Sequence, residues 1–280
     1  MCPAGSDVLM WTNQNAPVLF RLMSLSLKLF ALDLVGLDML MWTNQDAGVH
    51  ALGNTCHVDI QRVPPFLPKE LTRAINHFLQ LSAVEASVVA AREVPLSFHA
   101  RFQATERTYL YRIHASPSTP PSIFDRNRVW HVPCHLNVPA MRAAAAALCG
   151  FHDFSSFRAS GCQARSPLRS LTELSILEVT SWRACLPASS HPSCTTWQAP
   201  AGAKGGEGAT APSFLYHQVR LLVGLLKAVG AGAVQPDSVK SIVEARDIRG
   251  VPPMAPACGL YLANVAYGPT RPKRASSSQQ

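Results

Sequence analysis

The residues whose types and spacing could do chemistry first come together at residues 46–51, which read Asp46-Ala47-Gly48-Val49-His50-Ala51. Small residues follow the carboxylate, and Gly48 can take the positive φ of a tight turn. Asp46 is therefore a candidate for the tip of a loop that points into a cleft, where a carboxylate can act as a nucleophile or in acid and base chemistry. An aspartate in an ordinary turn is the alternative that these six residues alone favour.

A second group of candidate residues lies in a strand predicted over residues 106–113. Alternation places Tyr109 and Tyr111 on one face of this strand and Arg112 on the other. Aromatic side chains favour strands, so a place in the core of a sheet is one interpretation. Because several arginines lie nearby in the sequence, stacking on an RNA base is the competing interpretation.

Basic residues in two later segments are candidates for binding an anion. Arg158, Arg165 and Arg169 lie in predicted loops without a compensating acid, which indicates either a solvated basic loop or contacts to phosphate. A helix predicted over residues 214–229 carries His217 and Arg220 on one polar stripe. This helix is so apolar that it should be largely buried, and a buried arginine needs an anion such as a carboxylate or a phosphate.

The elements that must position these residues follow from hydrophobic periodicity and turn residues. Strands are predicted over residues 54–60, 84–94, 171–179 and 259–267, and helices over residues 69–81 and after residue 237 or 238. Asn137 is expected to cap a helix that ends before Gly150. Leucines at helical spacing predict another helix within residues 22–32, between two near-copies of one segment at residues 7–16 and 38–47.

Composition narrows the classes of partner. The 280 residues carry 25 Lys and Arg against 17 Asp and Glu, a formal net charge of +8 that suits nucleic acid first and a membrane surface second. The eight cysteines lack zinc-ligand spacing, so free thiols and no metal site are expected. Charged residues interrupt the apolar stretch at residues 18–42, so neither a membrane span nor a signal peptide is predicted.

Four blocks of the sequence, at residues 46–51, 98–111, 153–169 and 214–230, followed by residues 259–267, resemble the TruA family of tRNA pseudouridine synthases in the family's order. The resemblance implies the α+β pseudouridine synthase fold, in which two sheet-and-helix halves form a mainly antiparallel sheet around a basic cleft. The expected divisions are an atypical N-terminal segment at 1–45, an incomplete N-terminal half at 46–115, a C-terminal half at 122–270 with a mobile, low-complexity insert at 181–212, and a basic disordered tail at 271–280.

The resemblance also implies an activity, the isomerisation of a uridine in RNA to pseudouridine without cofactor or metal. Asp46 matches the catalytic aspartate, Tyr109 the tyrosine that stacks on the target base, and Arg220 the arginine that pairs with the aspartate. The other substrate-binding candidates are Arg158, Arg165, Arg169 and His217. The implied partner is tRNA, with mRNA as an alternative substrate and a homodimer as the assembly. The implied compartment is the mitochondrion, with cytoplasm or nucleus as alternatives.

Two departures from the family's pattern bear on that activity. The family places Gly-Arg-Thr before the aspartate, whereas this chain has Thr43, Asn44 and Gln45. Asn44 has no charge and cannot make the bidentate contacts of an arginine. The family's opening strand and first helix are also expected to have no counterpart in residues 1–45. A catalytically impaired RNA-binding protein on the same scaffold is therefore the alternative, and a chain that does not fold stably is a third interpretation.

Overall fold

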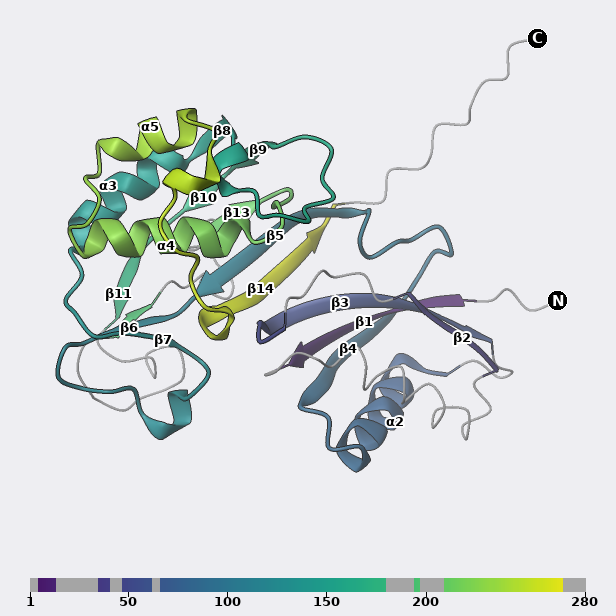
Figure 1. Ribbon diagram of the computed structural model, residues 1–280. Coiled ribbons are helices and arrows are strands. Elements are labelled where there is room, and N and C mark those ends of the chain that lie inside the picture. The colour runs from purple at the N-terminus through teal and green to yellow at the C-terminus, as the bar shows by residue number, and fades with distance from the viewer. Residues whose placement is uncertain are drawn as a thin grey trace, which may run out of the picture.

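A computed structural model describes residues 5–13, 35–40, 47–61, 66–179, 194–196 and 209–268 of the chain. Asp46, the three residues before it, the helix predicted within residues 22–32 and the tail at residues 271–280 lie outside this part. The expectations for them stay predictions. The described residues form a mixed fold of helices and one large sheet, as the α+β class requires (Figure 1).

The main sheet has eight strands in the described residues. Its order is β10-β13-β5-β14-β3-β1-β4, with β2 also paired to β3. Every pairing in it is antiparallel except that of β14 with β3. Its strands are β1 (Gly5–Asn13), β2 (Val35–Leu40), β3 (His50–Gln61), β4 (Ala86–Val94), β5 (Ala104–Tyr111), β10 (Glu173–Leu174), β13 (Ala209–Ala211) and β14 (Leu260–Tyr267). The expected mainly antiparallel sheet is confirmed.

One expectation about this sheet is wrong. Residues 1–45 were expected to supply no opening strand, yet β1 lies inside the sheet and pairs with both β3 and β4. The end of the insert expected at residues 181–212 belongs to the sheet, because β13 is buried and lies between β10 and β5. Most of the insert lies outside the described residues, and the expectation that it is mobile stays a prediction. The small side chains of Ala209 and Ala211 fit a crowded sheet interior, which the low-complexity composition around them conceals.

Helices cover the two ends of this sheet. Helix α2 (Pro68–Leu81) packs on β4, and helices α3 (Val138–Leu148), α4 (Gln218–Gly230) and α5 (Ser238–Glu244) lie together beside β5 and β14 (Figure 1). Asn137 caps α3 as predicted, because its side chain accepts a hydrogen bond from the amide of Ala140 at 3.0 Å. No helix in the described ranges is both long and apolar enough to cross a membrane.

Smaller elements complete the part around α3 and α4. Short strands pair as β6 (Ile113–Ala115) with β7 (Trp130–Val132), β8 (Gly150–Asp153) with β9 (Leu168–Leu171), and β11 (Leu177–Val179) with β12 (Cys194–Thr196). The single strand predicted over residues 171–179 is thus broken into β10 and β11, with its start in β9. Single 3-10 turns are η2 (Ile123–Asp125), η3 (Ser155–Phe157), η5 (Ile248–Gly250) and η6 (Ala257–Gly259).

The core lies between α3, α4 and the sheet. Tyr111 is fully buried there, and its hydroxyl donates a 2.6 Å hydrogen bond to the carbonyl of Pro256. The prediction of a sheet-core role is confirmed for this tyrosine. Gly224 lets α4 approach the segment at residues 253–255, because a Cβ at this position would overlap the carbonyl oxygen of Pro253. The close approach fixes α4, and with it Arg220, against the chain that leads into β14.

Candidate active site

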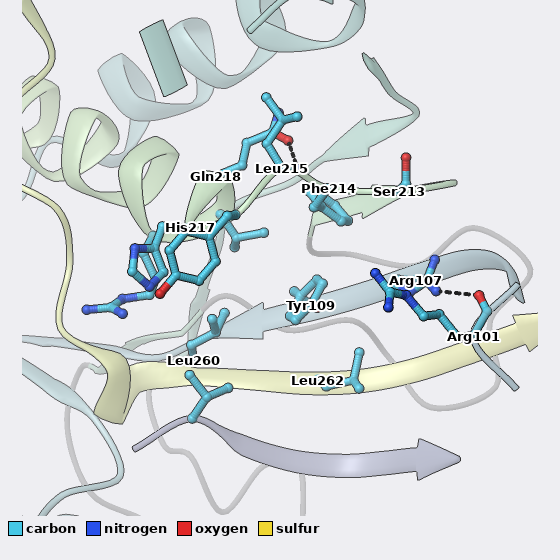
Figure 2. Close-up of a pocket in the computed structure, with 14 residues that line it drawn as sticks. Arg101, Arg107, Tyr109, Ser213, Phe214, Leu215, His217, Gln218, Leu260 and Leu262 are labelled. Atoms are coloured by element: carbon cyan, nitrogen blue, oxygen red, sulfur yellow. Dashed lines mark hydrogen bonds between the residues drawn. The ribbon is translucent and has the colours of Figure 1, made fainter. Parts of the chain in front are cut away.

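A pocket opens between the N-terminal end of α4 and the strands β5 and β14. Figure 2 shows its wall, in which Tyr109 lies between Arg107 on one side and His217 on the other. The cavity has a volume of about 220 Å³. Its lining residues are Val49, Arg101, Arg107, Tyr109, Ser213, Phe214, Leu215, Tyr216, His217, Gln218, Val219, Arg220, Leu260 and Leu262. The pocket thus combines cationic and aromatic side chains, as a site for a nucleotide requires.

Tyr109 is the aromatic residue at the centre of the pocket wall. It lies on β5, where its backbone is opposite Ala209 of β13 and Leu262 of β14. The rings of Tyr109 and Phe214 pack edge to face, with centroids 5.2 Å apart and planes at 89°. Tyr111, two residues later on the same face, is buried in the core. The alternation therefore holds, and of these two strand residues Tyr109 is the one that lines the pocket.

Arg107 and Arg101 line the pocket on one side of Tyr109. Arg107 donates hydrogen bonds to the carbonyl oxygens of Arg101 at 3.0 Å and Pro212 at 3.1 Å (Figure 2 draws the first). These bonds fix the Arg107 guanidinium and join the loop before β5 to the end of β13. Arg107 precedes Tyr109 by two residues, so the alternation of β5 puts both side chains on one face.

The other side of the pocket is the turn that leads into α4. The predicted helix at residues 214–229 begins later, because α4 starts at Gln218 and His217 takes a left-handed conformation with φ 61°. The amide of Gln218 donates to the carbonyl of Leu215, and the Gln218 side chain accepts from the Leu215 amide at 2.8 Å. The backbone amide and the side chain of the buried Gln218 therefore close a tight turn, which hydrophobic periodicity does not predict.

Arg220 lies in the first turn of α4 and lines the pocket. Its Nε donates to the carbonyl of Ala255 at 2.8 Å, and its own carbonyl accepts from the Ala255 amide at 3.1 Å. These bonds orient the guanidinium from the segment before β14. Arg220 is half-buried, and its pairing with an anion such as the Asp46 carboxylate or a phosphate stays a prediction.

The segment that follows Asp46 enters the same pocket. Gly48 has a φ of +83°, as predicted for a tight turn, and Val49 is buried in the pocket wall. Asp46 precedes Val49 by three residues and is outside the described part of the chain. The prediction that Asp46 reaches this cleft therefore stays a prediction, supported by the course of residues 47–49.

A buried polar cluster anchors the start of β3 next to Val49. The His50 ring stacks on Tyr261 with centroids 4.7 Å apart and planes at 23°, because β3 and β14 place these two residues side by side. His50 Nε2 lies 2.9 Å from the carbonyl oxygen of Asn127, so this nitrogen carries the proton and donates it. The start of β3 is thus held by both β14 and the loop at residues 126–129.

The same cluster contains a buried ion pair. Arg112 Nη2 lies 2.9 Å from Asp125 Oδ1, and the two side chains are 12% and 9% exposed. The Tyr261 hydroxyl donates to the carbonyl of Arg128 at 2.7 Å and accepts from Arg112 at 3.4 Å. Burial disfavours the charge of Arg112, but Tyr261 and Asp125 raise the net pKa of its guanidinium above the usual value. Arg112 is therefore a structural cation.

The structure does not bring the three loop arginines to the pocket wall. Arg158 donates to the carbonyls of Cys162 at 3.1 Å and Ala164 at 2.6 Å, which shapes its own loop. Arg169 on β9 donates to the carbonyl of Leu168 at 2.6 Å, whereas Arg165 is exposed. Two of the three are therefore tied to their own loops, and Arg165 is the most accessible to a phosphate.

Serines near these arginines serve the fold. The Ser155 hydroxyl donates to Asp153 at 2.6 Å, and the Ser156 hydroxyl donates to the carbonyl of Ile242 in α5 at 2.8 Å. The hydrogen bonds from Ser155 lower the pKa of the Asp153 carboxyl, and Arg246 pairs with it at 3.1 Å. These bonds show that the two hydroxyls stabilise the local fold.

Sequence reasoning missed several residues of the pocket wall. Arg101 and Arg107 had no proposed role. The spacing of Arg107 and Tyr109 within one strand is a signal that could have identified Arg107. Tyr216 and Phe214 were treated as parts of a helix and not as pocket residues. The missed wall residues include Arg101, Arg107, Ser213, Phe214, Tyr216, Leu260 and Leu262.

Comparison with known proteins decides the family. A family model described as tRNA pseudouridine synthase matches residues 144–268. A tRNA pseudouridine synthase A from Cereibacter sphaeroides is 43% identical over 220 residues, which cover 79% of this chain and 76% of the relative. The chain belongs to the tRNA pseudouridine synthase family. A second relative of the same name, from Paramagnetospirillum magneticum, is 41% identical over 222 residues, 79% of this chain and 75% of its own.

Members of the tRNA pseudouridine synthase family are isomerases, so the expected enzyme class is confirmed. The matched range at residues 144–268 contains the turn at residues 213–217, α4 with Arg220, and β14 with Tyr261. Ten of the fourteen residues that line the pocket therefore lie within the matched range.

Proposed function

We propose that this chain converts a uridine in tRNA to pseudouridine, and that Asp46 acts at the ribose C1′ of a uridine turned out of its stack. The observation that carries the proposal is the pocket shared by Val49, Tyr109 and Arg220. It joins the end of the segment that contains Asp46 to an aromatic ring and a cation. Membership of the tRNA pseudouridine synthase family supports the reaction class.

The chemistry requires a carboxylate and a surface that holds the base. Cleavage of the bond between C1′ and N1 builds positive, oxocarbenium-like charge on the ribose, which the Asp46 carboxylate would stabilise or capture. The freed uracil must turn and form a bond from C5 to C1′, while C5 loses its hydrogen. Tyr109 would keep the uracil in place by stacking, and a stacked base can rotate in its own plane.

Cations have two roles in this proposal. Arg220 would favour the charged form of Asp46 and hold the carboxylate toward the ribose. The other arginines of the pocket, together with Arg158, Arg165 and Arg169, would line a basic cleft for the RNA backbone and make binding sensitive to salt. His217 would contact the bound nucleotide from the turn that precedes α4.

The finer assignments rest on the resemblance of the sequence blocks. Within the family, we propose a likeness to the vertebrate tRNA pseudouridine synthase-like 1 proteins, with an atypical start in residues 1–45. The same likeness supports a mitochondrial location, a homodimer, and mRNA as a substrate besides tRNA. Analytical ultracentrifugation and fractionation of cells that express the chain test the assembly and the location.

The second candidate function is RNA binding without catalysis. The observation that favours it is the sequence Thr43-Asn44-Gln45 in the place where the family pattern has Gly-Arg-Thr. An arginine at this place would steady the aspartate and help to open the RNA, and Asn44 can do neither by charge. The scaffold and its arginines would still bind tRNA.

Tritium release from tRNA labelled at uracil C5 separates these functions, because C5 loses its hydrogen only when it bonds to the ribose. Release by the chain that disappears in Asp46→Ala, with tRNA affinity kept within about three-fold, supports the isomerase. Salt-sensitive binding of tRNA without release from either protein supports the binding function and contradicts the isomerase. Absence of a cooperative melt in either protein supports the third interpretation, a chain that does not fold stably.

A further inference from the structure

The turn between β13 and α4 carries two stacked aromatic rings at the rim of the pocket. The rings of Tyr216 and His217 lie 3.8 Å apart between centroids, with an angle of 24° between their planes. Both residues line the pocket, and Figure 2 shows His217 on the side of Tyr109 away from Arg107. The reaction itself needs one ring beneath the target base, and Tyr109 fills that role in the proposed mechanism.

The backbone at His217 is strained in a way that holds the stack. A left-handed conformation, here φ 61° and ψ 4°, is unfavourable for a residue other than glycine. The turn persists because Gln218 closes it through two hydrogen bonds to Leu215, and because the His217 carbonyl accepts from the Leu221 amide at 3.1 Å. Such strain accumulates at functional sites, where the surrounding bonds over-determine it.

The Tyr216 ring has one covered face and remains accessible. His217 stacks on one face of the ring, and the residue is nevertheless 40% exposed, so part of it remains accessible to a ligand. An accessible aromatic ring at a pocket rim offers a flat surface that a ligand can cover. A flat, partly apolar ligand such as a nucleobase fits this surface, since every base has a π face.

The chain next to Tyr216 supplies positive charge for a phosphate. The carbonyl of Tyr216 accepts from the amide of Ala159 at 3.4 Å, which joins the turn to the loop of Arg158 and the exposed Arg165. Arg220 lines the pocket on the same side. A nucleotide stacked on Tyr216 would therefore have cations within reach of its phosphate, beside a uridine held at Tyr109.

We propose that Tyr216 is a second base-stacking site, which holds the nucleobase adjoining the target uridine in the RNA and favours a purine there. The proposal rests on the proposed function only for the position of the target uridine. Two neighbouring nucleotides would then leave the RNA stack together, one on Tyr109 and one on Tyr216. Purines stack more strongly than pyrimidines because their ring systems are larger, so the neighbouring base becomes a determinant of which uridine is chosen.

Equilibrium binding of tRNA to three variants tests the stack and needs no turnover. Tyr216→Leu removes the ring and should weaken binding roughly 5- to 150-fold, the range for loss of one stacked base. Tyr216→Phe keeps the ring and should bind within about two-fold of the parent chain. Phe124→Leu removes an aromatic ring that is 69% exposed in η2, away from the pocket, and should leave affinity unchanged. Thermal melts of all three should match that of the parent chain.

Binding results overturn the proposal in two ways. Parent-like affinity of Tyr216→Leu would exclude a stacked base, and equal weakening in Tyr216→Leu and Tyr216→Phe would assign the effect to the hydroxyl. Because this assay reports on binding alone, it decides the proposal even where tritium release shows that the chain is inactive. Failure of the proposed function and failure of the second stacking site are therefore distinguishable.

Photo-crosslinking tests the neighbouring position directly. With p-benzoylphenylalanine in place of Tyr216, irradiation of the tRNA complex should give a crosslink at a nucleotide adjoining the uridine that the parent chain converts. Reverse transcription maps both the crosslink and the pseudouridine, and the same substitution at Phe124 should give no crosslink. A crosslink that maps several nucleotides from the converted uridine would refute the assignment to the adjoining base, as would the absence of any crosslink at position 216.

Discussion

Tyr109 and Phe214 pack edge to face, with ring centroids 5.2 Å apart and ring planes at 89°. This contact joins β5 to the turn before α4, and it fixes the plane of the ring on which the proposed mechanism turns the uracil. Edge-to-face pairs contribute about 0.5–1.5 kcal/mol beyond the area that they bury. Phe214 is therefore a positioning residue for Tyr109.

Replacement of Phe214 by leucine should lower the turnover rate more than it weakens binding. Without the edge contact, the Tyr109 ring samples other rotamers, and kcat for tritium release should fall roughly 2- to 12-fold while KM changes little. Tyr109→Phe is the matched control, because it keeps both the ring and the edge contact and should retain most of the activity. An unchanged kcat in Phe214→Leu would show that the contact does not orient the ring.

The buried pair of Arg112 and Asp125 should be the most sensitive polar contact of the fold. Asp125→Asn leaves the Arg112 guanidinium buried without its carboxylate, and such a loss costs about 3–5 kcal/mol. Chemical denaturation should show this decrease in the free energy of unfolding. Lys240 and Glu244 form an exposed pair in α5 at 4.0 Å, so Glu244→Gln is the control and should change stability by less than about 0.5 kcal/mol.

The consequence of Asp125→Asn for activity follows from the contacts of Tyr261. Arg112 donates to the Tyr261 hydroxyl, and Tyr261 stacks on His50 at the start of β3. Loosening this chain of contacts should disturb Val49 and the segment before it. Activity per folded molecule should therefore fall in Asp125→Asn and stay at the parent level in Glu244→Gln. Parent-like activity in a destabilised Asp125→Asn would separate the ion pair from the site.

Gly224 should tolerate no side chain, because α4 meets the carbonyl of Pro253 there. Gly224→Ala forces the helix or the segment at residues 253–255 to move, and overpacking of this kind costs about 1–3 kcal/mol. The melting temperature should fall accordingly. Gly250→Ala is the control, since a Cβ at Gly250 meets no atom within 4 Å. Equal melting temperatures for the two variants would contradict the close approach.

Local sequence signals predicted most of the helices and strands. Helices α2, α3 and α5 follow from periodicity and from caps such as Asn137, which act within a few residues. The start of α4 at Gln218 could not be predicted from local signals. His217 takes a left-handed conformation, which a histidine in the sequence does not indicate. Strand β13 was not predicted for a different reason. Its alanines form a strand because they pair with the neighbouring strands β10 and β5, which are distant in the sequence.

The residues of the site could be predicted only in part, because their position depends on the folded chain. Resemblance of short blocks named Tyr109, His217 and Arg220, and the fold brings these three to one pocket. The blocks also named Arg158 and Arg169, which bond to carbonyls of their own loops instead of lining the pocket. The sequence shows which residues are basic. Only the folded chain shows which of their side chains donate hydrogen bonds to backbone carbonyls and are therefore held away from a ligand.

Alkylation of the cysteines gives a test of the loop beside Tyr216. Burial alone would raise the pKa of the Cys162 thiol, but hydrogen bonds from the backbone of Tyr216 and Ala164, together with Arg158, lower it below the usual value. Burial raises the pKa of Cys149 and Cys258. Because the thiolate is the nucleophile, Cys162 should react with iodoacetamide at a lower pH than the other two. Mass spectrometry of peptides from samples alkylated between about pH 6 and pH 9 measures this order.

The same reagent reports on bound RNA. If tRNA covers the turn at Tyr216 and the loop of Arg158, it should slow the alkylation of Cys162 while Cys149, near α3 and β10, reacts at an unchanged rate. Arg158→Gln should raise the pH at which Cys162 reacts, because it removes the cation that favours the thiolate. Protection of Cys149 without protection of Cys162 would mean that RNA binds on another face, and it would contradict both the proposed cleft and the second stacking site.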